Sequence, residues 1–165
     1  MSKITNPLLF EGSTKPKVLV QFPNDENKPD YLELTLQARF NQTLAKALDC
    51  GHLFTKNGSI VSNFKEHKLD TEFTDVQLKL IGKDGDLDAF SPESCDKFVI
   101  KHSGEEGTTI TLRVSMEGHF DPFIEFFRAN RLTGFSFEIA ARQAELFEGG
   151  DRVDLSETKE ETVVQ

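Results

Sequence analysis

The sequence feature that most constrains the fold is a ten-residue stretch, Tyr31 to Phe40, in which apolar and polar side chains alternate strictly. The apolar positions are all even-numbered: Leu32, Leu34, Leu36, Ala38 and Phe40. Successive side chains of a β-strand point to opposite faces, so this alternation predicts a strand with one buried face and one solvated face. A chain built around such a strand needs a partner layer to cover the buried face.

Further runs share β-strand character, and short turn signals separate most of them. They cover residues 17–22, 52–55, 60–64, 76–80, 98–100, 108–116 and 134–143. The pair Asn57-Gly58 predicts a hairpin turn, because both residues tolerate positive φ. We therefore predict a mostly β fold, with α+β as the variant: an antiparallel β-sandwich or partly open barrel of about seven strands.

Two helices and one helical turn accompany these strands. Asn41 is a suitable cap for a short helix over residues 43–48. An amphipathic helix is predicted from Asp121 to Asn130, because the phenylalanines at 123, 126 and 127 share one face. Ser91-Pro92-Glu93 is predicted to begin a helical turn, with Ser91 as the cap and proline at the first helical position.

The length of 165 residues fits one domain. We expect a flexible N-terminal lead-in over residues 1–15, a globular β-rich domain over residues 16–148 and an acidic, disordered tail over residues 149–165. From Glu148 to the C-terminus the sequence holds six acidic and two basic residues, and its large apolar residues disappear after Gly149-Gly150.

Charge and cysteine content limit the partners and the compartment. A net charge of −9 argues against duplex DNA and anionic membranes, which bind mainly through Lys and Arg. No stretch approaches the ~20 apolar residues of a membrane helix, and the apolar run at residues 7–10 is too short for a signal peptide. With only two cysteines, Cys50 and Cys95, a reducing compartment is favoured over a disulfide scaffold, and we predict a cytoplasmic protein.

Known catalytic and metal-binding patterns give no firm candidate. Asp84, Asp86 and Asp88 have the spacing of the first three calcium-loop ligands, but Ala89 and Cys95 stand where that loop needs Gly and Glu. Cys50 and His52 are the only candidates for nucleophilic chemistry, and the sequence does not show whether they meet in a pocket. We predict no catalytic residues, no metal site and no cofactor, and we favour a non-enzyme over an enzyme.

The arginines are the most suggestive polar residues. Three of them fall on the polar sides of separate alternating strands, and two flank the end of the Phe-rich helix: Arg39, Arg113 and Arg142, then Arg128 and Arg131. If the three strands share a sheet, its outer face would present guanidinium groups that bind carboxylates or phosphates in bidentate fashion. The competing interpretation is cross-strand pairing with Glu33 and Glu138, which lie on the same outward set.

These observations leave several function classes open. The leading hypothesis is a non-catalytic binding or assembly module acting through protein–protein contacts, with a protein partner or with itself. The alternative is a β-barrel that binds single-stranded nucleic acid and recruits partners through its acidic tail. An acidic mimic of a phosphate chain is less favoured, because 28 acidic residues stand against 19 basic ones.

Overall fold

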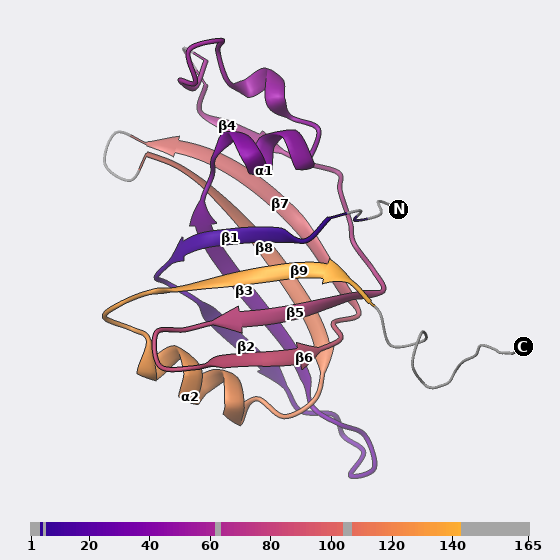
Figure 1. The fold of residues 1–165 in the computed structure, drawn as a ribbon. Helices are drawn as coiled ribbons and strands as arrows, with labels where there is room; N and C mark the ends of the chain where they lie inside the picture. The colour runs from indigo at the N-terminus through magenta and orange to yellow at the C-terminus, as the bar shows by residue number, and fades with distance from the viewer. Residues whose placement is uncertain (1–3, 5, 62–63, 104–106, 143–165) are drawn as a thin grey trace, which may run out of the picture.

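The fold is a two-layer antiparallel β-structure, seen in a computed structural model that describes residue 4 and residues 6–61, 64–103 and 107–142. One sheet has four strands in the order β1-β9-β5-β6, and the other has five in the order β2-β3-β8-β7-β4. Figure 1 shows the two sheets stacked as layers, with α1 and α2 at opposite ends of the molecule. The arrangement confirms the predicted antiparallel β-sandwich.

The elements have the following bounds. The four-stranded sheet contains β1 (Leu8–Ser13), β5 (Val76–Ile81), β6 (Asp86–Phe90) and β9 (Phe135–Ala141). The five-stranded sheet contains β2 (Lys17–Gln21), β3 (Tyr31–Arg39), β4 (Glu66–Lys68), β7 (Ser94–Ser103) and β8 (Gly107–Glu117). The helices are α1 (Gln42–Ala47), the 3₁₀ turn η1 (Gly51–Leu53) and α2 (Asp121–Ala129).

Strand β3 forms as its alternation predicts. It pairs with β8 in unbroken antiparallel register from Tyr31 opposite Glu117 to Arg39 opposite Thr109. Its even-numbered residues from Leu32 to Ala38 are buried at 0–1% exposure, and its odd-numbered residues face outward. The position of Arg39 at the end of the outward row follows directly from this period of two.

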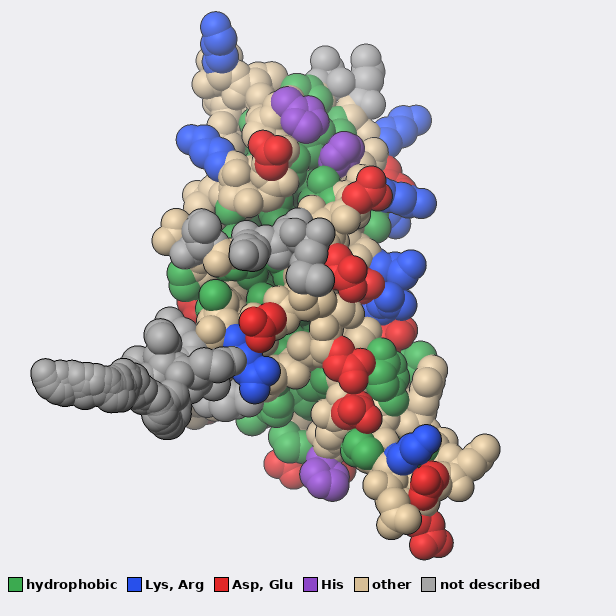
Figure 2. All heavy atoms as spheres, turned by 90° about the vertical axis from the view of Figure 1, so that its right-hand side faces the viewer, with side chains coloured by type: hydrophobic (Ala, Val, Ile, Leu, Met, Phe, Trp, Pro, Cys, Tyr) green, Lys and Arg blue, Asp and Glu red, His purple; other side chains and the backbone are tan. Residues whose placement is uncertain are grey.

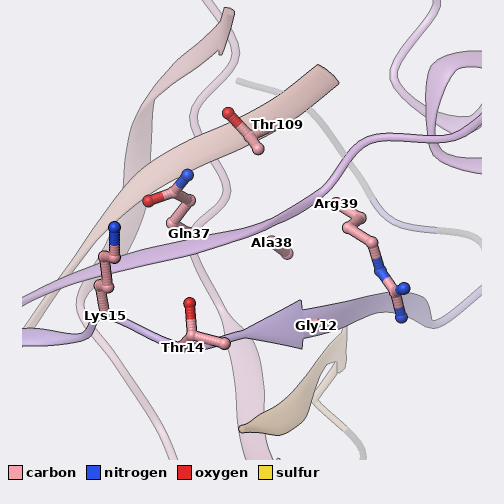
Figure 3. Close-up of a pocket in the computed structure, with 7 residues that line it drawn as sticks. All are labelled: Gly12, Thr14, Lys15, Gln37, Ala38, Arg39 and Thr109. Carbon is pink, nitrogen blue, oxygen red and sulfur yellow. The ribbon is translucent and has the colours of Figure 1, made fainter. Parts of the chain in front are cut away.

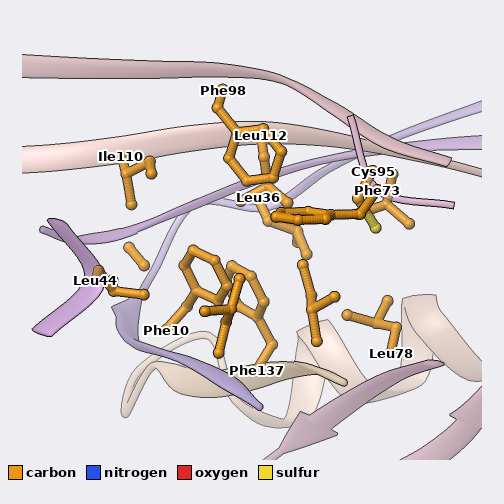
Figure 4. Packing of buried hydrophobic residues seen from close by; sticks show 14 of the residues in the cluster. Phe10, Leu36, Leu44, Phe73, Leu78, Cys95, Phe98, Ile110, Leu112 and Phe137 are labelled. Carbon is orange, nitrogen blue, oxygen red and sulfur yellow. The ribbon is translucent and has the colours of Figure 1, made fainter. Parts of the chain in front are cut away.

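The core between the sheets is rich in phenylalanine. Figure 4 shows Phe10 of β1 and Phe137 of β9 face to face, with ring centroids 4.7 Å apart and planes 7° apart. Phe73 and Phe98 meet edge to face at 5.7 Å. Phenylalanine carries a large apolar area without a polar atom, which suits a core closed on both sides by sheets.

Helix α2 covers one end of this core. Phe123 is fully buried and Phe126 is 9% exposed, so the predicted apolar face does point inward. The helix ends at Asn130, whose buried side chain donates from Nδ2 to the Phe126 carbonyl and accepts the Lys83 amide on Oδ1. Asn130 therefore fixes the end of α2 to the hairpin between β5 and β6.

The short helix α1 lies at the other end and begins as predicted. The Asn41 side chain accepts the Leu44 amide at 2.8 Å, which satisfies one of the amides left unpaired at a helix start. The Asn57-Gly58 turn also forms, with Gly58 at φ +84°, but only a single bridge, Phe54 to Ile60, flanks it.

Several expectations need correction. Residues 8–13 were expected within a loose lead-in, but they form β1. The side chains of Leu8 and Phe10 face the core, and Phe10 is completely buried. Ser91-Pro92-Glu93 does not begin a helical turn: β7 starts at Ser94, and Cys95 pairs with Val114 of β8. The described chain has nine strands: six match expected runs, and β1, β4 and β6 were not anticipated. The strands expected over residues 52–55 and 60–64 were wrong in the described part of the chain, where only the isolated bridge between Phe54 and Ile60 forms. The expected acidic tail lies outside the described residues, and among those described no helix is long and apolar enough to cross a membrane.

Candidate functional site

Arg113 lies near the middle of the five-stranded sheet, on its outer face, where its guanidinium pairs with two carboxylates. Its Nε and Nη2 donate to the two carboxylate oxygens of Asp96 at 2.9 and 2.8 Å, and Nη1 lies 3.6 Å from Glu33. These neighbours raise the pKa of the Arg113 guanidinium, chiefly through the hydrogen bonds that it donates to Asp96. The competing interpretation of cross-strand pairing therefore describes this arginine, with Asp96 as the main partner and Glu33 as the second.

The other predicted arginines do not form one platform with Arg113. Arg142 follows β9 of the opposite sheet, where its Nη1 lies 3.9 Å from Asp75. Arg128 is in the last turn of α2, Arg131 follows that helix, and both side chains are exposed. The condition that the strands share a sheet is met only by Arg39 and Arg113. Acidic and basic side chains are interspersed along the margin of the face drawn in Figure 2, so no extended cationic surface appears there.

Arg39 lines a pocket at the place where the chain crosses from one sheet to the other. Strand β2 pairs with β3 only as far as Lys17 opposite Thr35, so the end of β3 extends beyond it. Strand β1 of the opposite sheet lies against β3. The gap between them is a pocket of about 260 Å³, which we call the seam pocket; it is lined by Gly12, Thr14, Lys15, Gln37, Ala38, Arg39 and Thr109.

The polar groups of the seam pocket come from three separate elements. Figure 3 shows Lys15 at one end and Arg39 at the other, with Thr14, Gln37 and Thr109 between them. Thr109 faces Arg39 across the β3–β8 ladder. Two cations and three neutral polar side chains thus line the pocket, and none of the described residues in its lining carries a carboxylate.

The Arg39 side chain lies against the backbone of Gly12. Gly12 has φ +73°, a backbone conformation that favours glycine, where the β1–β9 register shifts between Phe10 and Ser13. A Cβ on residue 12 would lie 2.6 Å from Arg39 Nε and 3.1 Å from Cζ. The guanidinium therefore rests against bare backbone, an approach that only glycine permits.

A buried hydroxyl lies in the same segment. Ser13, between two residues of the pocket wall, is 0% exposed, and its Oγ has no hydrogen-bond partner among the described residues. The sequence analysis missed Lys15, Thr14 and Ser13 because it assigned them to a loose lead-in. The buried Leu8 and Phe10 are separated by Leu9, which is apolar but exposed, so the sequence shows no alternation that would reveal the strand.

The outer edge of β2 is a second candidate surface. Beyond its ladder with β3, no strand of the described chain pairs with the other side of β2. Leu19 on this strand is 52% exposed and Phe22 just beyond it is 70% exposed, with the Phe22 ring edge-on to Phe120 at 6.4 Å. Large apolar side chains beside an unpaired strand edge form a template for another strand.

The cysteine and histidine candidates do not assemble. Cys50 and Cys95 are buried at 1% and 0% exposure, and burial raises their pKa to about 11 and about 12 respectively. His52 is exposed and packs edge-on to His67, with ring centroids 5.8 Å apart. Within the described residues no group of three or more His, Cys, Asp or Glu side chains could hold a metal ion.

Fold and site together define an antiparallel β-sandwich with a pocket at the seam between its sheets, lined by Lys15 and Arg39, and an open edge on strand β2. Comparison of the chain with models of protein families, with curated protein sequences and with solved structures finds no match.

Proposed function

We propose that this chain is a non-catalytic binding module that acts through protein–protein contacts, with an extended segment of a partner protein pairing along β2. The observation that carries the proposal is the free edge of β2 together with the exposed Leu19 and Phe22. In such strand addition the main-chain hydrogen bonds supply affinity, and alternate side chains supply specificity.

Strand β2 suits this role better than the other edge strands. Its register with β3 is unbroken over all five residues, so its outer side presents a regular row of backbone groups. Edge strand β1 lies against β3 of the opposite sheet, β4 has only three residues, and the pairing of β6 with β5 is irregular. A short or irregular edge is a poor template for a further strand.

The flanking residues define the chemistry of the partner. Pro16 and Pro23 bracket β2 and have no backbone N–H, so the added strand is limited to about five residues. Lys17 and Leu19 both face outward on this edge strand. We expect an apolar partner residue beside Leu19 and an acidic one beside Lys17, because cross-strand neighbours of these kinds stabilise a ladder.

The experiment is selection from a displayed library of random eight-residue peptides, with affinities of the enriched peptides measured by fluorescence anisotropy. Leu19→Lys places a charge on the proposed contact. We expect it to weaken peptide binding at least about tenfold, which corresponds to a loss of about 1.4 kcal/mol of binding free energy and is typical of an interface hot spot. The matched control is Leu9→Lys, since Leu9 is a 44% exposed leucine on the other long edge strand. Failure to enrich any peptide, or equal losses in both variants, would refute the proposal.

Sedimentation equilibrium tests whether the partner is a second copy. A concentration-dependent dimer that Leu19→Lys abolishes and Leu9→Lys preserves would identify self-association through β2. A dimer unaffected by Leu19→Lys would place the contact elsewhere and count against the β2 edge.

Single-stranded nucleic acid is the alternative partner, and the described structure favours it less. Arg113 is neutralised by its carboxylate partners, and Phe22 is the one strongly exposed aromatic side chain among the described residues. Sequence-tolerant binding of single strands relies on several exposed aromatic platforms and a cationic groove. An anisotropy titration with a labelled oligonucleotide at low salt tests it: micromolar binding that weakens with salt would overturn this ranking.

A further inference from the structure

The free edge of β2 carries a sequence that is symmetric about its central residue, Leu19. From Pro16 to Phe22 the chain reads Pro-Lys-Val-Leu-Val-Gln-Phe. In either direction from Leu19 a valine comes first, then a long polar side chain, then a residue with an apolar ring. An interface between two identical edges related by a two-fold axis needs this symmetry, because each residue then meets its counterpart on the second copy.

Antiparallel pairing of two β2 edges about Leu19 brings compatible side chains together. The facing pairs are Leu19 with Leu19, Val18 with Val20, Lys17 with Gln21 and, just outside the ladder, Pro16 with Phe22. No two like charges face each other, an arrangement that would destabilise the pairing. The Phe22 ring, which is 70% exposed, would gain an apolar neighbour in the proline of the second copy.

A shift of the two-fold axis by one residue gives a poorer ladder. With the axis at Val18, the charged Lys17 faces the apolar Leu19, and Pro16 enters the ladder without a backbone N–H to donate. With the axis at Val20, Pro23 enters the ladder with the same defect. Only the register centred on Leu19 pairs the five residues of β2 with one another.

The two faces of the strand also match in this register. A two-fold axis perpendicular to the sheet keeps the inner faces of both copies on the same side. Val18 and Val20 lie opposite Leu34 and Leu32 of β3 and are only half-buried at this edge, so the valines of the second copy would cover them further. Leu19, which is 52% exposed on the outer face, would be covered by the same residue of the second copy.

The charges at the two ends of β2 favour the antiparallel direction. Lys17 begins the strand, and the loop over residues 23–30 that follows it holds three acidic residues and one lysine. Figure 1 shows this loop extending beyond the body of the sandwich. Antiparallel pairing therefore puts the acidic loop of each copy at the end of the ladder where the lysine of the other copy lies.

The interface would be small and the association reversible. Five residues a side with two large apolar side chains form less contact than a standard interface, which buries about 1,600 Å². The net charge of −9 on each copy also opposes association.

We infer that two copies of this chain form a two-fold dimer through antiparallel pairing of their β2 edges, centred on Leu19. The five-stranded sheets of the two copies would then be continuous. The inference rests on the proposed use of the β2 edge and names the partner as a second copy of the chain.

The test is sedimentation equilibrium on the whole chain and on variants of the residue at the axis. We expect a dissociation constant of about 10–100 μM, measured over about 5 μM to 1 mM protein at about 0.15 M salt. Leu19→Lys and Leu19→Glu each place like charges at the axis, and each alone should weaken association at least about tenfold.

A mixture of the two variants tests the register itself. Residue 19 of one copy meets residue 19 of the other only when the axis passes through it, so an equimolar mixture would bring opposite charges together. We expect a heterodimer severalfold tighter than the association of either variant alone, followed through a dye on one of the two. The matched controls are Leu9→Lys and Leu9→Glu, which change an exposed leucine on β1 and should leave the dissociation constant unchanged.

Cross-linking gives a second measurement that needs no added charge. Directly opposed residues of an antiparallel pair have Cα atoms about 4.5–5.5 Å apart, within the range of a disulfide. Mild oxidation should therefore join Leu19→Cys chains and leave Leu9→Cys and the unsubstituted protein, whose two cysteines are buried, unjoined.

Three results would each overturn the inference: a protein that stays monomeric over that concentration range, a dimer that both Leu19 variants preserve, or a mixture no tighter than the single variants. Folding of every variant is verified from its amide NMR spectrum. Failure of the dimer is distinguishable from failure of the proposed function, because enriched peptides bound by a strictly monomeric protein would overturn the dimer alone.

Discussion

Three glycines with nearly the same positive φ angle allow conformational strain to be separated from steric contact. Gly12, Gly107 and Gly134 have φ values of +73°, +76° and +74°. An L-residue in this left-handed region costs about 1–2 kcal/mol, and replacing glycine by alanine returns about 0.4–1 kcal/mol by restricting the unfolded chain. Each Gly→Ala substitution therefore shares a conformational cost of about 1 kcal/mol.

The surroundings of the three glycines then set the differences in unfolding free energy. A Cβ at residue 107 meets nothing within 4 Å, so Gly107→Ala should cost only the shared term. At residue 12 the Cβ meets the Arg39 side chain, which is exposed and can turn away, so we expect about 1–1.5 kcal/mol. At residue 134 the Cβ would lie 3.0 Å from the Ser13 carbonyl oxygen, which belongs to backbone paired with β9. Overpacking against such a neighbour adds about 1–3 kcal/mol, giving about 2–4 kcal/mol in total.

Urea unfolding followed by far-ultraviolet circular dichroism measures this order, since the chain has no tryptophan and one tyrosine. The expected order of destabilisation is Gly134→Ala first, with Gly12→Ala and Gly107→Ala close together, at unchanged dependence on urea concentration. A Gly134→Ala variant as stable as Gly107→Ala would refute the close approach of β1 and the start of β9. A Gly12→Ala loss as large as that of Gly134→Ala would refute the freedom of the Arg39 side chain.

Two further predictions concern the engaged arginine and the thiols. A double-mutant cycle with Arg113→Met and Asp96→Asn, measured by urea unfolding, should give a coupling free energy of about 1–2 kcal/mol, because the ion pair is bidentate and partly buried. A coupling free energy below about 0.3 kcal/mol would contradict a stabilising Arg113–Asp96 pair. Burial raises the pKa of Cys50 to about 11 and that of Cys95 to about 12, so at pH 8 the native thiols should react with a disulfide reagent far more slowly than in urea. Since the folded state favours the neutral thiols, the stability they contribute is full below pH 9 and declines as the pH rises towards 11–12. Native thiols that react as fast as unfolded ones, or stability that increases over that range, would contradict their burial.

Long alternating segments were predictable because one physical rule determines them. From Tyr31 to Arg39 a period of two places every even side chain in the core, and no other element is needed to see it. Helix α2 follows equally from the spacing of Phe123, Phe126 and Phe127, and α1 from the cap at Asn41. These are local signals with strong periodicity or definite hydrogen-bond chemistry.

Short or irregular strands were not predictable in the same way. Strand β1 is interrupted by a register shift before Ser13, which breaks its alternation after only a few residues. The segment before β7 resembles a helix start, since Ser91-Pro92 is a common capping pair, yet the pairing of β7 with β8 overrides that local preference. The number of strands and the fate of the N-terminal segment are therefore tertiary properties.

The contrast between Arg39 and Arg113 shows why the surroundings of each arginine could not be predicted from the sequence. Both lie on the outer face of one sheet and occupy equivalent outward positions in alternating strands. They differ because Asp96 lies directly opposite Arg113 on β7, just before the register shift between Asp96 and Val99, whereas Arg39 lies at a strand end that β2 does not reach. Strand order and register thus leave one guanidinium neutralised in the ladder and the other facing a pocket. Residues 12–15, 37–39 and 109 meet only after β1 has joined the opposite sheet, so the charge of Arg39 is specified by the sequence, but its availability is a property of the assembled fold.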